Sequence, residues 1–296
     1  QNPAMSGRLI DGEWHNKRDW ETEGGAFERQ ESVFRKQVEA GSEHEPEAGR
    51  YHLYVSLACP WAHRALIMRK IKGLENMISI SVTHHYMGDH GWSFQHADGV
   101  IKDDILRSKF LYEVYIAAES NFSGRVSVPV LWDKENSTIV NNESSEIIRM
   151  LNNAFNEVGA IGPNYYPPYL TNKIDDVNAR IYNTVNNGVY KAGFATTQEA
   201  YDEAVTELFE TLDWLEDLLG RRRYITGDRI TEADWRLFPT LIRFDSVYQG
   251  HFKCNIRRII EYPNLWAYTR ELYQFSGVAE TVNLDHIKKH YYGSHE

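Results

Sequence analysis

The chain of 296 residues contains only two cysteines, which excludes a disulfide framework. Neither cysteine lies in a zinc-binding motif, so we expect no metal ion. Isolated thiols are typical of a reducing compartment, and we expect a cytoplasmic protein. No apolar stretch approaches the ~18 residues that span a bilayer, which argues against a membrane protein. The first 19 residues lack the apolar core of a secretory signal.

Basic side chains are also scarce, since 32 lysines and arginines stand against 42 aspartates and glutamates, for a net charge of −10. Such a charge repels a phosphate backbone, and the basic clusters at 221–223 and 288–289 are short enough to be solvated faces. We therefore expect no nucleic-acid partner. Proline is limited to nine residues, whereas 8 Trp, 18 Tyr and 12 Phe provide a core and argue against disorder.

The chain changes character at residue 50. Residues 1–50 are polar and irregular, and we interpret them as an N-terminal extension rather than a domain. After it, apolar alternation and helical spacing predict the order β–α–β–α–β–β–α, which indicates an α/β domain over 51–160. The predicted strands are 51–57, 78–83, 126–132 and 138–140, and the predicted helices are 61–71, 103–119 and 146–151.

Residues 165–296 contain no convincing strand, and we predict an all-helical domain with a C-terminal tail. Thr231 and Asp234 have the spacing of a capping box, and Ile230 and Trp235 occupy the flanking staple positions. The fold class is therefore α/β followed by all-α. Helical spacing occurs at 171–191, 198–219, 236–248 and 263–275.

Cys59 is the strongest candidate for chemistry. It follows a predicted strand and precedes a helix whose first residue is Pro60, a favoured residue at that position because the first N–H of a helix has no partner. The sulfur then faces free backbone N–H groups and the positive end of the helix dipole, which favour thiolate over thiol. The alternative is a buried structural thiol, but the strand–Cys-Pro–helix context favours the reactive interpretation.

Cys59 has no resolving partner nearby, because Ala62 stands where a dithiol motif places its second cysteine. Cys254 has no helix-start context, and we interpret it as structural. Unless Cys254 comes close, an internal disulfide cycle is excluded. An external thiol must then resolve the site, which in a reducing cell means glutathione.

Two further motifs fit a peptide-like ligand. If the Val128–Pro129 bond is cis, the polar backbone groups of Val128 can bind a ligand; the alternative is a proline on an edge strand. Glu143 and Ser144 stand at a helix start, where a hydroxyl and free N–H groups bind a carboxylate and Glu143 binds an ammonium group. The alternative for this pair is a plain N-cap.

With these motifs in view, the segment 51–64 resembles the glutathione transferases. More narrowly, the sequence resembles the Xi class, the glutathionyl-hydroquinone reductases, and the likeness covers about residues 5–292. The motifs that carry the narrower resemblance are Cys59-Pro60-Trp61-Ala62, Gly91-Trp92, residues 123–132, residues 190–195 and Arg243-Phe244-Asp245.

The resemblance implies a thioredoxin-like N-terminal domain, a helical C-terminal domain and a homodimer. It implies that Cys59 is the nucleophile, which takes glutathione from a glutathionyl-hydroquinone as a mixed disulfide that a second glutathione resolves. The implied glutathione-binding residues are Trp92, Arg125, Val128, Pro129, Glu143 and Ser144. The implied residues that contact the aromatic quinol are Tyr190, Tyr248 and Tyr291.

Two other functions stay open from the sequence. An Omega-like thiol transferase that reduces dehydroascorbate would use the same Cys59, and only its acceptor site would differ. A non-catalytic ligand-binding protein on the same fold is the third interpretation, because a fold does not fix a function.

Overall fold

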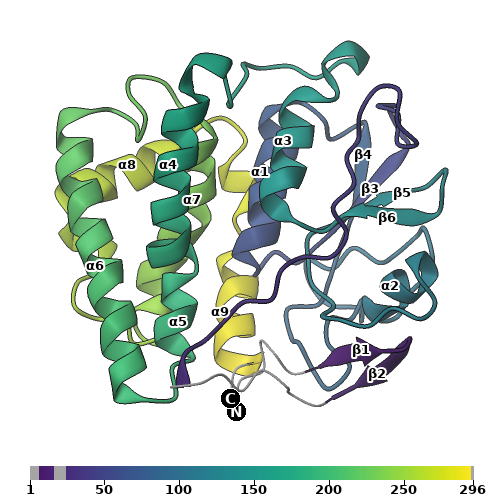
Figure 1. Ribbon diagram of the computed structural model, residues 1–296, viewed down its shortest axis with the longest axis horizontal. Coiled ribbons are helices and arrows are strands. Elements are labelled where there is room, and N and C mark those ends of the chain that lie inside the picture. The colour runs from purple at the N-terminus through teal and green to yellow at the C-terminus, as the bar shows by residue number, and fades with distance from the viewer. Residues whose placement is uncertain (1–6, 17–24, 295–296) are drawn as a thin grey trace. The chain divides into compact units, whose positions relative to one another are not determined.

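The computed structural model describes residues 7–16 and 25–294 (Figure 1). The chain divides into two compact units. Of the described residues, the first contains 7–16, 30–162 and 280–294, and the second contains 25–29 and 163–279. The structure thus assigns residues 280–294 to the first unit, whereas the sequence analysis placed them with the helical domain.

The first unit is built on a four-stranded sheet with the strand order β4-β3-β5-β6. Strands β3 and β4 are parallel, and β5 pairs antiparallel with both β3 and β6. All of β3 is buried, as expected for a central strand. The strands are β3 (Tyr51–Val55), β4 (Ile78–Val82), β5 (Val130–Asp133) and β6 (Thr138–Asn141).

Three helices complete the predicted order of the α/β part: α1 (Pro60–Ile71), α2 (Tyr112–Ala118) and α3 (Ser144–Asn153). Helices α1 and α3 lie side by side, and α2 contacts β6 (Figure 1). The predicted succession β–α–β–α–β–β–α is confirmed. A further helix of this unit, α9 (Leu284–Ser294), occupies what the sequence analysis described only as a tail.

The predicted helix at 103–119 is wrong over its first half, because only α2 forms. The carboxylate of Asp103 accepts hydrogen bonds from the backbone N–H groups of Ile105, Leu106 and Ser108 at 3.0–3.1 Å. It also accepts one from the hydroxyl of Tyr54 at 2.8 Å. An aspartate that bonds its own backbone in this way stabilises a turn in competition with a helix.

The N-terminal extension is more regular than the sequence analysis expected. Strands β1 (Arg8–Ile10) and β2 (Glu13–His15) form an antiparallel hairpin. Its turn residues Asp11 and Gly12 both have positive φ, at 48° and 79°, as a two-residue hairpin turn requires. An Asp-Gly pair is a recognised signal for such a turn, so the sequence did contain the information.

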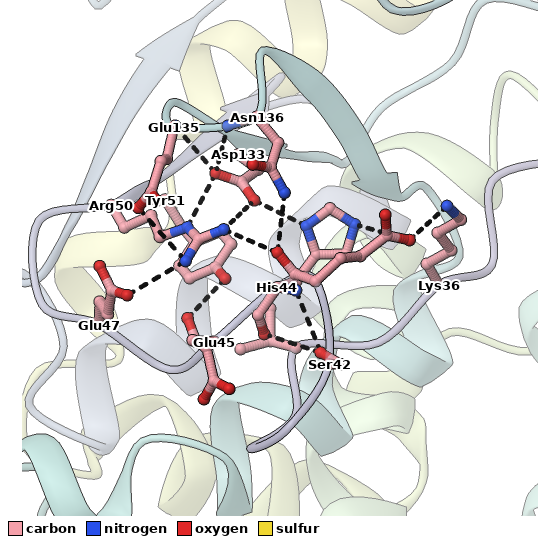
Figure 2. A network of polar contacts seen from close by, with 12 residues as sticks. Lys36, Ser42, His44, Glu45, Glu47, Arg50, Tyr51, Asp133, Glu135 and Asn136 are labelled. Carbon is pink, nitrogen blue, oxygen red and sulfur yellow. Dashed lines mark hydrogen bonds and ion pairs between the residues drawn. The ribbon is translucent and has the colours of Figure 1, made fainter.

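The later part of the extension is fixed to the sheet by a buried carboxylate, Asp133 at the end of β5 (Figure 2). Arg50 donates to it from Nε at 3.0 Å and from Nη2 at 2.9 Å, and His44 Nδ1 lies 2.6 Å from Oδ2. The backbone N–H groups of Glu135 and Asn136 donate to Oδ1 at 2.9 and 3.1 Å. Burial alone would raise the pKa of Asp133, but these donors lower it to about 2.

The second unit is helical, with no β-strand among its described residues. Its long helix α6 (Gln198–Arg221) contacts α5 and α8 (Figure 1). A π-helical turn at Tyr182–Asn186 interrupts the segment 171–191, which the sequence analysis took as continuous. A second one at Phe244–Tyr248 forms the end of the predicted helix 236–248. The other helices are α4 (Thr171–Ile181), α5 (Gly188–Gly193), α7 (Glu232–Arg243) and α8 (Pro263–Gln274). Within residues 26–294, the structure also has 3-10 turns at Asn156–Val158, Pro168–Leu170, Ile259–Glu261 and Ala279–Thr281. Among the described helices of both units, none is long and apolar enough to cross a membrane.

The predicted capping box at the start of α7 is confirmed. Thr231 Oγ1 accepts from the backbone N–H of Ala233 at 3.3 Å, and the Asp234 carboxylate accepts from the N–H of Thr231 at 2.8 Å. Asp234 also receives the hydroxyl of Tyr268 at 2.5 Å. Burial raises the pKa of Asp234 to about 6 despite these donors.

We expect Thr231→Ala to lower the free energy of unfolding by about 1–2 kcal/mol, because Thr231 is fully buried and its loss leaves a helix N–H without its acceptor. Thr197→Ala is the matched control. Thr197 caps α6 through the N–H of Ala200 but is exposed, so water can replace it, and we expect a loss of about 0.5 kcal/mol. Urea unfolding followed by circular dichroism compares the two variants. Equal losses would contradict the importance of burial at Thr231.

Candidate active site

Cys59 lies where the structure brings a strand end and a helix start together. It is the N-cap residue of α1, with extended backbone (φ −77°, ψ 123°), and Pro60 is the first residue of the helix. Its carbonyl accepts from the N–H of His63 at 3.0 Å. Cys59 is partly exposed, and its predicted position between a strand and a helix start is observed.

The Val128–Pro129 segment lies beside this thiol. Cys59 Sγ is 3.8 Å from the carbonyl oxygen of Val128. The Val128–Pro129 peptide bond is cis, the first of the two alternatives that the sequence left open. Strand β5 begins only at Val130, later than predicted, since proline has no N–H to donate to a sheet. Val128, which is 69 positions from Cys59 in the sequence, thus lies beside its sulfur.

Glu143 and Ser144 form the start of α3. The Glu143 carboxylate accepts from the N–H and the hydroxyl of Ser145 at 3.3 and 3.0 Å, so its capping role is observed. It also accepts from the hydroxyl of Ser32 at 3.0 Å. Ser144 is buried, and its hydroxyl lies 3.4 Å from Nη1 of Arg64.

Arg64 connects the two helix starts. It stands on the second turn of α1 and is only 2% exposed. Its guanidinium lies 4.8 Å from the ring centroid of Trp61 and reaches Ser144 on the other side. A buried cation thus stands between the helix that begins after Cys59 and the helix that begins at Ser144, where it favours negative charge.

Trp92 and Tyr291 are placed by the C-terminal helix α9. The ring of Trp92 lies 4.8 Å from that of His290, and the adjacent Tyr291 is buried. Arg125 is half-buried in the loop that precedes Val128. Neighbouring residues anchor that loop, because Gly124 pairs with Leu9 of the hairpin. All of these residues belong to the first unit.

Tyr190 and Tyr248 come together in the second unit. Tyr190 lies on α5 and Tyr248 ends the second π-helical turn, and their ring centroids are 6.1 Å apart. Phe252 completes the cluster, at 5.3 Å from Tyr190 and 5.2 Å from Tyr248. The structure therefore brings together two of the three predicted tyrosines, while Tyr291 lies in the other unit.

Comparison with known proteins decides the family. Models described as the N-terminal and C-terminal domains of glutathione S-transferase match residues 58–154 and 198–271. The chain is 57% identical to the glutathionyl-hydroquinone reductase PcpF of Sphingobium chlorophenolicum, over 98% of this chain and 92% of that one. It matches the Xi class transferase of Natrialba magadii with a TM-score of 0.94 at 49% identity, over 98% and 90% of the two chains. The chain belongs to the Xi-class glutathione transferases.

A glutathione-bound structure of the Escherichia coli homologue YqjG also matches this Xi-class chain, with a TM-score of 0.91 at 53% identity over 98% and 91% of the two chains. The resemblance seen in the sequence is thereby confirmed, together with the expected fold class. Among the described residues, no group of three or more metal-ligating side chains has the geometry to hold an ion.

Sequence reasoning on this Xi-class transferase missed the contacts that fix the site from a distance. His63, one turn after Cys59, is 1% exposed, and its Nε2 lies 2.8 Å from Oγ1 of Thr281. Lys70 of the same helix pairs with Glu280. These contacts attach the segment that leads into α9 to the helix that begins after Cys59. Apolar spacing within 284–294 was the one available signal, and it indicates a helix without saying where it packs.

Proposed function

We propose that this chain is a glutathione-dependent reductase that removes the glutathionyl group from glutathionyl-hydroquinones. The observation that carries the proposal is the placement of Cys59, a partly exposed thiol at the N-terminus of α1 beside the carbonyl of Val128. Curated relatives named glutathionyl-hydroquinone reductase, with identities of 55–57%, support the same reaction.

In the first step, the Cys59 thiolate attacks the sulfur of the conjugate. A bond forms between the two sulfurs, the bond from that sulfur to the ring carbon breaks, and its electron pair stays on the ring carbon, which takes up a proton. The products are the free hydroquinone and a mixed disulfide of Cys59 with glutathione. A second glutathione thiolate then attacks the mixed disulfide and releases glutathione disulfide and the Cys59 thiolate. Glutathione is the reductant and the quinol ring is reduced.

We assign glutathione binding to residues of the first unit, which also contains Cys59. Arg125 would pair with or lie near the glycyl carboxylate, and the backbone of Val128 would bond the peptide-like part. Ser144 and Glu143 would hold the amino-acid end, since a helix N-terminus favours a carboxylate and a carboxylate binds an ammonium group. The burial of Arg64 behind Ser144 supports this assignment. Pro129 and Trp92 complete the set.

Tyr190, Tyr248 and Tyr291 are assigned to the quinol. An aryl carbon–sulfur bond is hard to break directly, and a shift of the ring toward its keto tautomer weakens it. Phenolic side chains can assist by moving protons to and from the ring oxygens. The pairing of Tyr190 with Tyr248 supports a shared role of those two residues.

The resemblance to the family also predicts a homodimer and a cytoplasmic location for this chain.

We expect wild-type protein with excess glutathione to turn over a glutathionyl-hydroquinone at least about a hundredfold more efficiently than dehydroascorbate. The physical reason is that the quinol ring can stack on the aromatic side chains of the acceptor site. Dehydroascorbate has no aromatic ring and cannot stack in this way. Formation of glutathione disulfide, followed by coupled NADPH consumption, gives kcat/KM for both substrates. Preference for dehydroascorbate would support the Omega-like alternative, and activity toward neither would support the ligand-binding alternative.

A further inference from the structure

A short part of the N-terminal extension, residues 25–29, packs within the second unit against the tyrosine cluster. The carbonyl of Gly25 accepts from the N–H of Thr196 at 3.1 Å. Phe27 is 3% exposed, and its ring lies 6.3 Å from Tyr190 and 5.7 Å from Phe194. The extension therefore contributes side chains to the surroundings of Tyr190.

Arg29 is the charged member of this segment. Its guanidinium carbon lies 4.8 Å from the ring centroid of Tyr190 and 5.3 Å from that of Phe27. Its Nε donates to Oδ1 of Asn187 at 2.9 Å, and Asn187 is itself 6% exposed on the turn before α5. Two rings and a buried amide thus fix the position of a half-buried cation on the face of Tyr190.

The aromatic surroundings of Arg29 strengthen its electrostatic effect on a bound ligand. Aromatic rings (Phe27, Phe194 and Phe252) enclose the neighbourhood of Tyr190, so the field of the guanidinium is screened less than at an open surface. A negative group that binds within several ångströms of this cation gains about tenfold in affinity at an effective dielectric constant near 20–40. A neutral group of the same shape gains nothing comparable.

We infer that Arg29 is a specificity residue of the acceptor site, which favours glutathionyl-hydroquinones whose ring carries a negative charge over neutral ones. The inference rests on the proposed function, because it takes Tyr190 as a wall of the quinol site. The relevant substrate class is a quinol ring with a carboxylate substituent or with a hydroxyl acidified by electron-withdrawing neighbours.

The test uses two matched conjugates, a glutathionyl-hydroquinone with a ring carboxylate and the same molecule with a carboxamide. Wild-type protein should prefer the carboxylate in kcat/KM, and Arg29→Gln should reduce the ratio of the two values about tenfold. Arg29→Lys, which keeps the charge but not the planar stacking, should retain most of the preference. Raising the salt concentration should weaken the wild-type preference but leave that of Arg29→Gln unchanged.

Arg180→Gln is the control, because Arg180 stacks on Trp214 at 4.1 Å in the same unit and should leave the ratio unchanged. If Arg29→Gln left the ratio of the two kcat/KM values unchanged, whether or not turnover of both conjugates fell, the inference would be overturned. Urea unfolding of each variant identifies a folding defect. If Arg29→Gln has one, the kcat/KM ratio of the two conjugates in Arg29→Lys decides whether the charge of residue 29 sets the preference. If wild-type protein turned over neither conjugate, the proposed function itself would fail, a result distinct from loss of the charge preference.

Discussion

Replacing Cys59 with serine should reduce turnover of a glutathionyl-hydroquinone by at least about a thousandfold. A serine hydroxyl is not ionised at neutral pH and cannot form the mixed disulfide on which both steps depend. The helix start that stabilises a thiolate at this position does not compensate for that difference in acidity. Steady-state assays with excess glutathione measure the loss. Intact-mass spectrometry of wild-type protein mixed with the conjugate alone should detect one bound glutathione, which the variant should lack.

Cys254→Ser provides the matched control for the same chemical change. Cys254 is fully buried, and burial raises the pKa of its thiol well above the usual range, so it cannot act as a nucleophile at neutral pH. We expect its variant to keep turnover within about twofold of wild type. Glutathione binding should survive in Cys59→Ser, because the residues assigned to hold glutathione are unchanged. Residual activity above a tenth in Cys59→Ser would rule out Cys59 as the nucleophile.

The parts of the fold that the sequence predicted well are those set by local patterns. Alternating apolar residues located β3, and Pro60 and the Thr231–Asp234 pair located two helix starts, because each signal lies within a few residues of its effect. Helical spacing at 103–111 misled, since the pattern carries no information about the side chain of Asp103 bonding its own backbone.

The candidate site divides along the same line. Cys59 was identified from its place between a strand and a helix, and the structure confirms that placement. Contacts between residues far apart in the sequence were beyond sequence reasoning: His63 contacts Thr281 across 218 positions, and Arg29 contacts Asn187 across 158. No periodicity links residues so far apart, and such pairs become neighbours only through tertiary packing. The roles of the glutathione-binding residues and the tyrosines therefore stay predictions.

The second large effect concerns stability. Asp133→Asn should lower the free energy of unfolding by about 3 kcal/mol at pH 7, because it removes the charge that compensates the buried guanidinium of Arg50 and bonds His44 (Figure 2). The volume is unchanged, so the loss reports the charge and its hydrogen bonds rather than a cavity. Asp217→Asn is the matched control. Asp217 pairs with Arg221 on an exposed helix face, and we expect a loss of less than about 0.5 kcal/mol.

The pH dependence separates this explanation from a simple packing defect. The pKa of Asp133 is lowered to about 2 in the folded protein, below its ordinary value of 3.8, so its carboxylate contributes stability that is fully present above about pH 4. That contribution is lost as the pH falls through about 2, where the folded protein also protonates the carboxyl group. The difference in urea midpoint between wild type and Asp133→Asn should therefore be constant from pH 7 to 5 and shrink below pH 4. If the difference in urea midpoint stayed the same down to pH 2.5, side-chain packing and not the charge of Asp133 would hold the extension to β5.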